Sequence, residues 1–532
     1  MENILPAPQL KMTEEEAQRR FEELQKKLVP LWKSIGAFNH DEQTVVIVPS
    51  MNIDSDFQGN ELQAYEERFL FLLLLLRQPR ARLIYVTSQM IHPSVVDYYL
   101  DLLPGVIPSQ ARKRLFLISP LDCSPRSLSL KLLERPRLLQ QIRDLIINPD
   151  FAHLVPYNTT SLERDLAIQL GIPMYGADPK FFHLGTKTGC RRIFSQEGVT
   201  HPLGIEDLHS LDEVIAAIEN MSAQREGGLQ EVILKLNEGV SGEGNALVRL
   251  GGRSTPDAIE AAIKGMEYEA DYMNYDDFMK NLASRGGVVE ERITGEEMRH
   301  PSVQMRATPG GQVQLLSTHD QILGGANGQT YLGCRFPAND EYAAAITREA
   351  EKVGKRLAKE GVMGRFALDF VVARTPSAGE TDWRLFAIEI NLRKGGTTHP
   401  FLTLQFLTDG TYNPETAKFN TPRGQEKHFV ASDHVQSPLY RTFTPDDLFD
   451  IAVRHGLHFD TACQTGAVFH MMAALGDTGS VGLTAVGDSP ENAQEIYERV
   501  VKVLNEEAQS SVGLVDEPEI KGVEAEAKDF TV

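Results

Sequence analysis

Short apolar runs alternate with helical stretches through the first 150 residues, and this alternation constrains the fold more than any other feature of the chain. The apolar runs are Val45–Val48, Leu83–Val86 and Leu115–Ile118. The helical stretches are Glu61–Arg77, Val95–Leu102 and Leu128–Ile147. Such alternation is typical of an open, mostly parallel sheet covered by helices. We therefore predict that the chain begins with an α/β domain.

The chain is too long for one domain, because 532 residues exceed the size at which single cores stop growing, about 250–300 residues. From about residue 180, glycine clusters separate strand-like runs, which indicates an α+β region with antiparallel strands. An acid-rich end starts at Asn505 and predicts a frayed tail. We expect an N-terminal parallel-sheet domain over 1–180, a core over 181–400, a small C-terminal α/β domain over 401–510 and an acidic tail over 511–532.

Charge and apolar content narrow the range of partners. With 53 basic and 74 acidic residues, the net charge of −21 is unsuited to binding nucleic acid. The most apolar stretch, Phe69–Leu76, is far shorter than the ~20 residues that span a membrane. Four cysteines stand far apart, and the start of the chain shows no signal-peptide pattern. We expect a soluble cytoplasmic protein without nucleic-acid or membrane partners; the sequence leaves a homo-oligomer open.

One lysine and one glycine-rich loop suggest phosphate binding, although neither GxxxxGK[ST] nor GxGxxG occurs. Lys235 interrupts the apolar strand Glu231–Leu236, and a lysine buried there needs a counter-charge. The following segment, Glu238–Asn245, contains glycines that let backbone N–H groups turn toward phosphate oxygens. The alternative is a plain hairpin loop beside an edge-strand lysine.

Acidic and amide side chains interrupt two later hydrophobic strands. Glu389 and Asn391 are two residues apart and share one strand face, and Asp369 lies on a neighbouring strand. Mg²⁺ prefers such oxygen ligands together with substrate phosphates. Arg365 and Arg393 are suited to bidentate contacts with phosphate or carboxylate. A structural ion pair between the strands is the alternative interpretation.

Taken in order, these motifs resemble the ATP-grasp superfamily of carboxylate–amine ligases. The matching segments are 185–199 with Lys187, 232–245 with Lys235, 288–297, and the set Asp369, Glu389 and Asn391. The resemblance implies that ATP is bound and that both lysines contact its phosphates. It implies a mobile phosphate lid that includes Glu238, Ser241, Gly242 and Gly244.

The same resemblance assigns the remaining nucleotide contacts and the metal. Glu290, Glu291 and Ile293 would form the adenine hinge, and Glu297 would bind the ribose. Asp369, Glu389 and Asn391 fall on the family's Mg²⁺ ligands.

The N-terminal sheet domain, the segment Glu389–Pro400 and the additional C-terminal region resemble the pheganomycin-type peptide ligases within this superfamily. That resemblance implies an amide or peptide bond between a small-molecule carboxylate and an amine, each an amino acid or peptide. The reaction would pass through an acyl phosphate and release ADP and phosphate. Arg365 and Arg393 are the candidates for holding the acyl phosphate. Residues 322–333, with Asn327, Gln329 and Tyr331, are candidates for the acceptor side, and His399 for a base.

Two other functions remain open from the sequence. The chain could stop at phosphorylating a small molecule, as an ATP-dependent kinase does. It could also be a non-catalytic nucleotide-binding regulatory protein. The intact set of lysines, carboxylates and asparagine argues against the second alternative, because a decayed site should lose ligands first.

Overall fold

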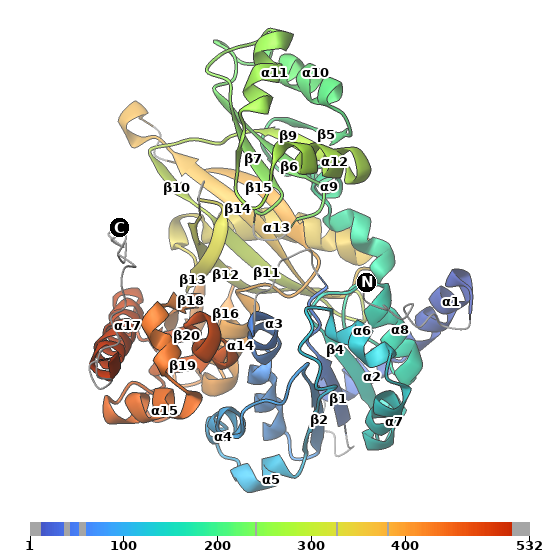
Figure 1. Cartoon of the computed structure of the whole chain (residues 1–532), viewed down its shortest axis with the longest axis vertical. Helices are drawn as coiled ribbons and strands as arrows, with labels where there is room; N and C mark the ends of the chain where they lie inside the picture. Colours follow the sequence, from blue (N-terminus) through green and yellow to red (C-terminus); the bar gives the residue numbers. More distant parts are fainter. Residues whose placement is uncertain are drawn as a thin grey trace.

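The computed structural model describes residues 12–36, 43–52, 60–239, 242–325, 328–379 and 382–512. Figure 1 shows three bodies around a central region: a parallel sheet at the lower right, a smaller sheet with helices at the top, and C-terminal elements at the lower left. A large antiparallel sheet links the top body to the C-terminal elements.

The predicted parallel sheet is confirmed. Its strands lie in the order β3-β2-β1-β4, and each neighbouring pair is parallel. Its strands are β1 (Gln43–Val48), β2 (Ala81–Val86), β3 (Leu115–Ile118) and β4 (Ala152–Pro156). The helices of this part are α1 (Glu14–Gln25), α2 (Leu28–Gly36), α3 (Glu61–Glu67), α4 (Pro93–Asp101), α5 (Pro108–Arg112), α6 (Leu128–Leu133), α7 (Pro136–Leu145) and α8 (Ser161–Leu170).

Two helices predicted as continuous are interrupted. The stretch predicted over 61–77 forms α3 and then a separate 3₁₀ helix, η1 (Leu70–Arg77). The stretch predicted over 128–147 breaks between α6 and α7, where Pro136 begins the second helix. Proline lacks the N–H that a continuing helix would need and is well placed in a first turn.

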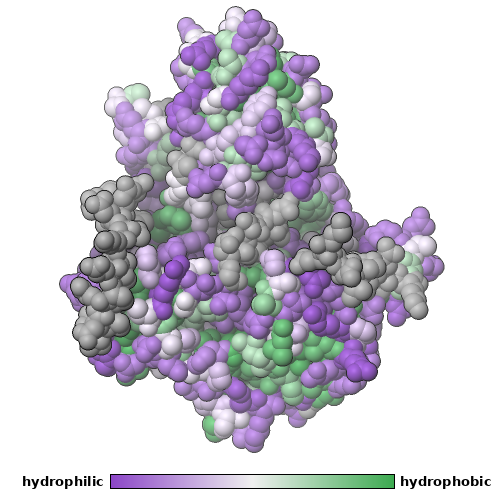
Figure 2. Space-filling model, in the orientation of Figure 1, coloured by the Kyte–Doolittle hydropathy of each residue, from purple (hydrophilic) through white to green (hydrophobic). Residues whose placement is uncertain are grey.

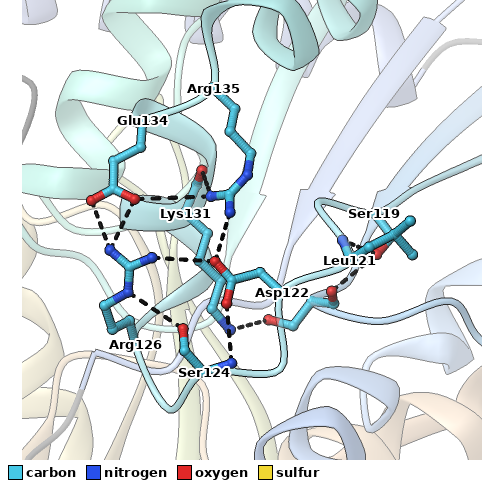
Figure 3. Close-up of polar contacts among 9 residues, drawn as sticks. Ser119, Leu121, Asp122, Ser124, Arg126, Lys131, Glu134 and Arg135 are labelled. Carbon is cyan, nitrogen blue, oxygen red and sulfur yellow. Dashed lines mark hydrogen bonds and ion pairs between the residues drawn. The ribbon is translucent and has the colours of Figure 1, made fainter. Parts of the chain in front are cut away.

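Ion pairs fix the loop that follows β3 (Figure 3). Asp122 lies 2.7 Å from Arg135 and 3.2 Å from Arg126, and Arg126 lies 2.7 Å from Glu134. Partial burial opposes ionisation of Asp122, but hydrogen bonds from Ser124 and Arg135 hold its pKa below the ordinary value. This network secures the start of α6, which carries the buried Lys131.

The top body is a five-stranded antiparallel sheet in the order β5-β9-β6-β7-β8. Its strands are β5 (Gly204–Leu208), β6 (Glu231–Leu236), β7 (Asn245–Arg249), β8 (Glu267–Tyr268) and β9 (Gly287–Glu291). The helices α10 (Leu211–Ser222), α11 (Pro256–Lys264) and α12 (Tyr275–Arg285) pack on it, and α9 (Lys187–Glu197) lies below (Figure 1).

The large sheet has nine strands in the order β10-β14-β11-β12-β13-β18-β20-β19, with β15 also paired to β14. Strands before residue 400 are β10 (Glu297–Arg299), β11 (Pro301–Ala307), β12 (Val313–Gly324), β13 (Thr330–Phe336), β14 (Gly364–Arg374) and β15 (Arg384–Asn391). Strands after it are β18 (His428–Gln436), β19 (Gly466–His470) and β20 (Ser480–Gly487). Since β13 pairs with β18, the C-terminal strands extend the sheet of the core.

Helices complete the layers on this sheet. α13 (Asp340–Glu360) packs its apolar side, including Ile346, Val353 and Leu357, against β11 and β14. The C-terminal helices are α14 (Thr398–Thr408), α15 (Pro445–Arg454), α16 (Leu475–Thr478) and α17 (Pro490–Val512), and β16 (Thr411–Asn413) pairs with β17 (Lys418–Asn420).

The expected frayed end from Asn505 is wrong for its first part. Helix α17 continues through Asn505 to Val512, and Ala508 is fully buried in the core of the C-terminal elements. The apolar positions of this helix therefore outweigh its acidic composition. The rest of the predicted tail, residues 513–532, lies outside the described residues.

Within the described parts of the chain, no helix is both long and apolar enough to cross a membrane. Figure 2 shows hydrophilic residues over most of the face in view, especially over α10, α11 and α12 at the top.

Candidate active site

Two cavities meet where the N-terminal sheet, the top body and the large sheet come together. The hinge cavity, of about 500 Å³, runs from residues 290–293 past the end of β15 to the N-terminal and C-terminal elements. The loop cavity, of about 580 Å³, is lined by residues 158–162 after β4 and by residues 237–239 after β6. Both cavities are lined by Glu389 and Asn391 of β15 and by Arg393, which follows the end of that strand.

Most of the predicted site residues line these cavities. Those in the hinge cavity are Lys187, Lys235, Gly242, Glu290, Glu291, Ile293, Asp369, Glu389, Asn391 and Arg393. Glu238 lines the loop cavity. Gln329 and Tyr331, predicted for the acceptor side, also line the hinge cavity. Ser241 and Asn327 lie outside the described residues.

Four predicted residues line neither cavity: Gly244, Glu297, Arg365 and His399, the last of which is described below. Glu297 forms an ion pair of 2.7 Å with Arg374. Arg365 faces Arg306 and Tyr175, and burial together with the Arg306 charge lowers its pKa to about 10. The structure therefore brings Arg393, and not Arg365, to the cavity walls.

The acidic set is held by strand pairing. Asp369 on β14 is directly opposite Glu389 on β15, and the Asn391 amide donates a hydrogen bond of 2.9 Å to Asp369. Burial and the nearby Glu389 charge raise the pKa of Asp369 to about 6. Two facing carboxylates and an amide oxygen form a hard-oxygen donor set that suits a divalent cation, whose charge would relieve the repulsion between them. The residues present fit Mg²⁺.

Each predicted lysine is paired with a carboxylate. The Nζ of Lys187 lies 2.6 Å from Glu389, and the Nζ of Lys235 lies 2.5 Å from Glu290. Glu290 is also 2.8 Å from Arg191. Burial raises the pKa of Glu290, but the charges of Lys235 and Arg191 outweigh burial and hold this pKa below its ordinary value. The counter-charge that the sequence predicts for a buried Lys235 is thus Glu290.

The hinge cavity ends in a cluster that the motifs do not predict as a unit. Asp433 Oδ1 lies 3.0 Å from His399 Nε2 and 2.8 Å from His470 Nε2, and the two ring nitrogens are 3.0 Å apart. Asp433 sits in an irregular stretch of β18, where a bulge directs both Asp433 and His434 to the cavity wall. Gly482 leaves room for this cluster, because an added Cβ would come within 2.1 Å of His470.

The three residues of this cluster, His399, Asp433 and His470, are types that bind metals, but a protein cation already pairs with the carboxylate. The three ligand atoms lie as close together as those of a metal site, but Arg68 lies 2.8 Å from the second oxygen of Asp433. Burial lowers the pKa of His399 to about 3, although Asp433 opposes the shift, so this imidazole is neutral. His399 lines neither cavity, which leaves the predicted base without direct access to them.

Sequence reasoning missed Arg68, Tyr157 and Asp433, which all line the hinge cavity. Arg68 immediately precedes the most apolar run of the chain, and a charge at that position is the signal that could have identified it. Tyr157 follows β4 at the carboxyl edge of the parallel sheet, where open sheets bind ligands. Met51, which follows β1 at the same edge, also lines the hinge cavity.

Comparison with protein families gives two matches. The family described as IQCH-like, ATP-grasp matches residues 253–415, and the PGM1 C-terminal domain matches residues 447–500. Both matched segments lie within the large sheet and the elements packed on it, except that the first begins in the top body.

Two relatives match most of the chain. An L-propargylglycine--L-glutamate ligase of Streptantibioticus cattleyicolor is 28% identical over 478 residues, which cover 88% of this chain and 93% of the relative. The IQ motif-containing protein H of Danio rerio is 24% identical, over 90% of this chain and 49% of the relative. The chain thus spans about half the length of the second relative.

Among solved structures, an ADP complex of N5-carboxyaminoimidazole ribonucleotide synthetase aligns with 87% of this chain and 97% of its own, at 10% identity and a TM-score of 0.49. The family match covers the strands that carry the acidic set, and the relative from Streptantibioticus cattleyicolor covers nearly the whole length. Residues 253–415 of this chain therefore match an ATP-grasp family domain.

Proposed function

We propose that the protein is an ATP-dependent ligase that joins a carboxylate to an amine through an acyl phosphate and releases ADP and phosphate. One observation carries the proposal: a single cavity contains residues 290–293, both lysines, the facing carboxylates and Arg393. The relative named L-propargylglycine--L-glutamate ligase supports amino acids as the substrates.

In this proposal, residues 290–293 receive the adenine, and Lys187 and Lys235 contact the phosphates. The loop between β6 and β7, which includes Gly242, closes over them. Asp369, Glu389 and Asn391 hold Mg²⁺, which neutralises charge on the phosphates. Lys187 then exchanges its contact with Glu389 for one with phosphate.

The residues of the chain have separate tasks in the two steps. In the first step the γ-phosphoryl group leaves ADP and bonds to a carboxylate oxygen, and Arg393 stabilises the charge that develops there. In the second step the amine nitrogen bonds to the acyl carbon, phosphate leaves with the C–O bond electrons, and the nitrogen loses its proton to the departing phosphate. Closing the cavity protects the acyl phosphate from water.

The proposal includes the division of the chain into regions 1–180, 181–400 and 401–510, all of which line the hinge cavity. The nucleotide site lies within residues 181–400, and the 1–180 and 401–510 regions supply the far wall of the hinge cavity. Because the C-terminal strands continue the core sheet, the 401–510 region and the core are expected to unfold together.

The test is ADP release from the protein with ATP, Mg²⁺ and pairs of L-amino acids. We expect ADP formation that requires both members of a pair, and a dipeptide-sized product by mass spectrometry. ADP formation with one non-amine substrate and a stable phosphorylated product would instead establish a kinase.

A further inference from the structure

Three consecutive charged residues at the end of α3 are buried, which is costly unless each has a partner. Glu66, Glu67 and Arg68 are 0%, 3% and 5% exposed. They directly precede the apolar helix η1, and Arg68 lines the hinge cavity. Helix α3 lies between the parallel sheet and the C-terminal elements (Figure 1).

The two glutamates fix the end of α3 from both sides. Glu66 accepts a hydrogen bond of 2.7 Å from the Ser88 hydroxyl, which also accepts one of 2.8 Å from Lys131, the lysine in the network of Figure 3. Glu67 accepts a hydrogen bond of 2.9 Å from the backbone N–H of Ala473 in the C-terminal elements. Arg68 is therefore held in place by contacts to both regions.

The guanidinium of Arg68 lies against two aromatic rings and one carboxylate. Its central carbon is 4.8 Å from the ring centre of Tyr65 and 5.3 Å from that of Tyr157. One terminal nitrogen donates to Asp433, and the buried Nε has no hydrogen-bond partner among the described residues. Since His399 and His470 also contact Asp433, its negative charge is shared among several groups.

A second guanidinium, that of Arg393, also contacts Tyr157. Arg393 lies 5.9 Å from the Tyr157 ring centre and 3.4 Å from its hydroxyl, and it has no ion pair within the described parts of the chain. Burial raises the pKa of Tyr157, but the charges of Arg393 and Arg68 outweigh burial and hold this pKa below its ordinary value. The Nε of Arg68 and the guanidinium of Arg393 therefore keep N–H donors that no carboxylate of the described residues satisfies.

We propose that Arg68 binds a free carboxylate on the amine substrate, so that the amine must be an amino acid or a peptide and not a simple amine. This inference rests on the proposed ligase function. The phosphates already have Lys187, Lys235 and the metal set, whereas Arg68 lies at the end formed by the N-terminal and C-terminal regions. A planar guanidinium suits a carboxylate, and Tyr65 and Tyr157 provide aromatic walls.

The first test needs no substitution. For each L-amino acid that serves as the amine, the rate is compared with that of the amine lacking its carboxylate, such as L-leucine against 3-methylbutylamine. We expect kcat/KM to be about 100-fold lower for the amine without the carboxylate, since the charge-assisted hydrogen bonds are lost. Equal kcat/KM values for the two would overturn the inference while leaving the ligase function in place.

The second test compares two arginines that flank the same helix. Arg68→Lys keeps the charge near Asp433 but loses the planar fork, and it should raise the KM for the amino acid at least tenfold. Arg77→Lys is the matched control, because Arg77 pairs with Asp409 at 2.8 Å and lines neither cavity. The KM for ATP should change less than threefold in both variants.

The outcomes of these tests are separable. If Arg68→Lys discriminates between L-leucine and 3-methylbutylamine as strongly as the wild type does, Arg68 does not bind the carboxylate. If neither compound supports ADP release with any acid, and no other amine does, the proposed ligase function itself fails. A Tm within a few degrees of wild type shows that Arg68→Lys is folded.

Discussion

At the scale of single residues, each of the two predicted lysines of the site is paired with an acidic group. Lys187 contacts Glu389 and Lys235 contacts Glu290, so both lysines are neutralised before nucleotide arrives. Because side chains alternate between the two faces of a strand, the sequence predicts that Glu389 and Asn391 share one face, with Asp369 on the neighbouring strand. Arg68 and Asp433 could not be predicted, because they are 365 positions apart and meet only through the tertiary fold.

Glu389 tests the metal assignment. Glu389→Gln removes one charge from the set with Asp369 and Asn391 while keeping the side-chain volume. We expect kcat to fall at least 100-fold, because a weakened metal site costs several kcal/mol of transition-state stabilisation. Steady-state ADP release measures the effect, and Glu360→Gln, which affects only an ion pair with Arg356 on α13, is the control. A Glu389→Gln protein with near-normal turnover would contradict the assignment.

At the scale of secondary structure elements, local pattern predicted the strands, and long-range pairing decided their sheets. β14 and β15 are the two hydrophobic strands that the sequence predicts around Asp369 and Glu389. The pairing of β13 with β18 joins segments about 100 residues apart, and no local periodicity encodes it. The break between α3 and η1 also escaped prediction, because residues 61–77 read as one helical stretch.

The loop between β6 and β7 is expected to respond to nucleotide. Glycines at 239, 242 and 244 permit many backbone conformations until phosphate contacts select one. Amide hydrogen exchange in residues 238–245 should slow at least tenfold with saturating ATP and Mg²⁺. The turn Gly251–Gly252, at the other end of β7, should exchange at an unchanged rate. Unchanged exchange in both segments would identify the loop as a plain hairpin.

Helix α3 makes the protein sensitive to pH. Burial raises the pKa of Glu67 to about 7, whereas an unfolded glutamate titrates near 4.5. Between these values the folded protein binds more protons than the unfolded chain, so stability falls as pH rises through this window.

Glu67→Gln removes this buried charge. We expect the variant to be about 1–3 kcal/mol more stable than wild type at pH 8, with the difference vanishing near pH 4. Urea unfolding at both pH values measures it, and the exposed Glu495→Gln on α17 is the control. A destabilised Glu67→Gln at pH 8 would show that the ionised carboxylate is needed by the Ala473 N–H.

At the scale of the whole molecule, three regions of the chain build the hinge cavity. The core supplies the lysines and the acidic set, the N-terminal region supplies Arg68 and Tyr157, and the C-terminal region supplies Asp433. Residues predicted from motifs lie in the core, whereas the residues that motifs missed come from the other two regions. Motifs shared with a family identify the residues of the core. The walls of the hinge cavity that the other two regions form depend on how these regions pack, which no motif encodes.

The central claim is that the γ-phosphoryl group of ATP moves to a carboxylate, and hydroxylamine trapping tests it most directly. With an accepted acid, ATP, Mg²⁺ and hydroxylamine in place of the amine, the protein should form a hydroxamate and ADP in equal amounts. Both lysines and the acidic set lie together in the hinge cavity, which favours this γ-transfer. Formation of the hydroxamate with one equivalent of AMP and pyrophosphate, and no ADP, would contradict the account.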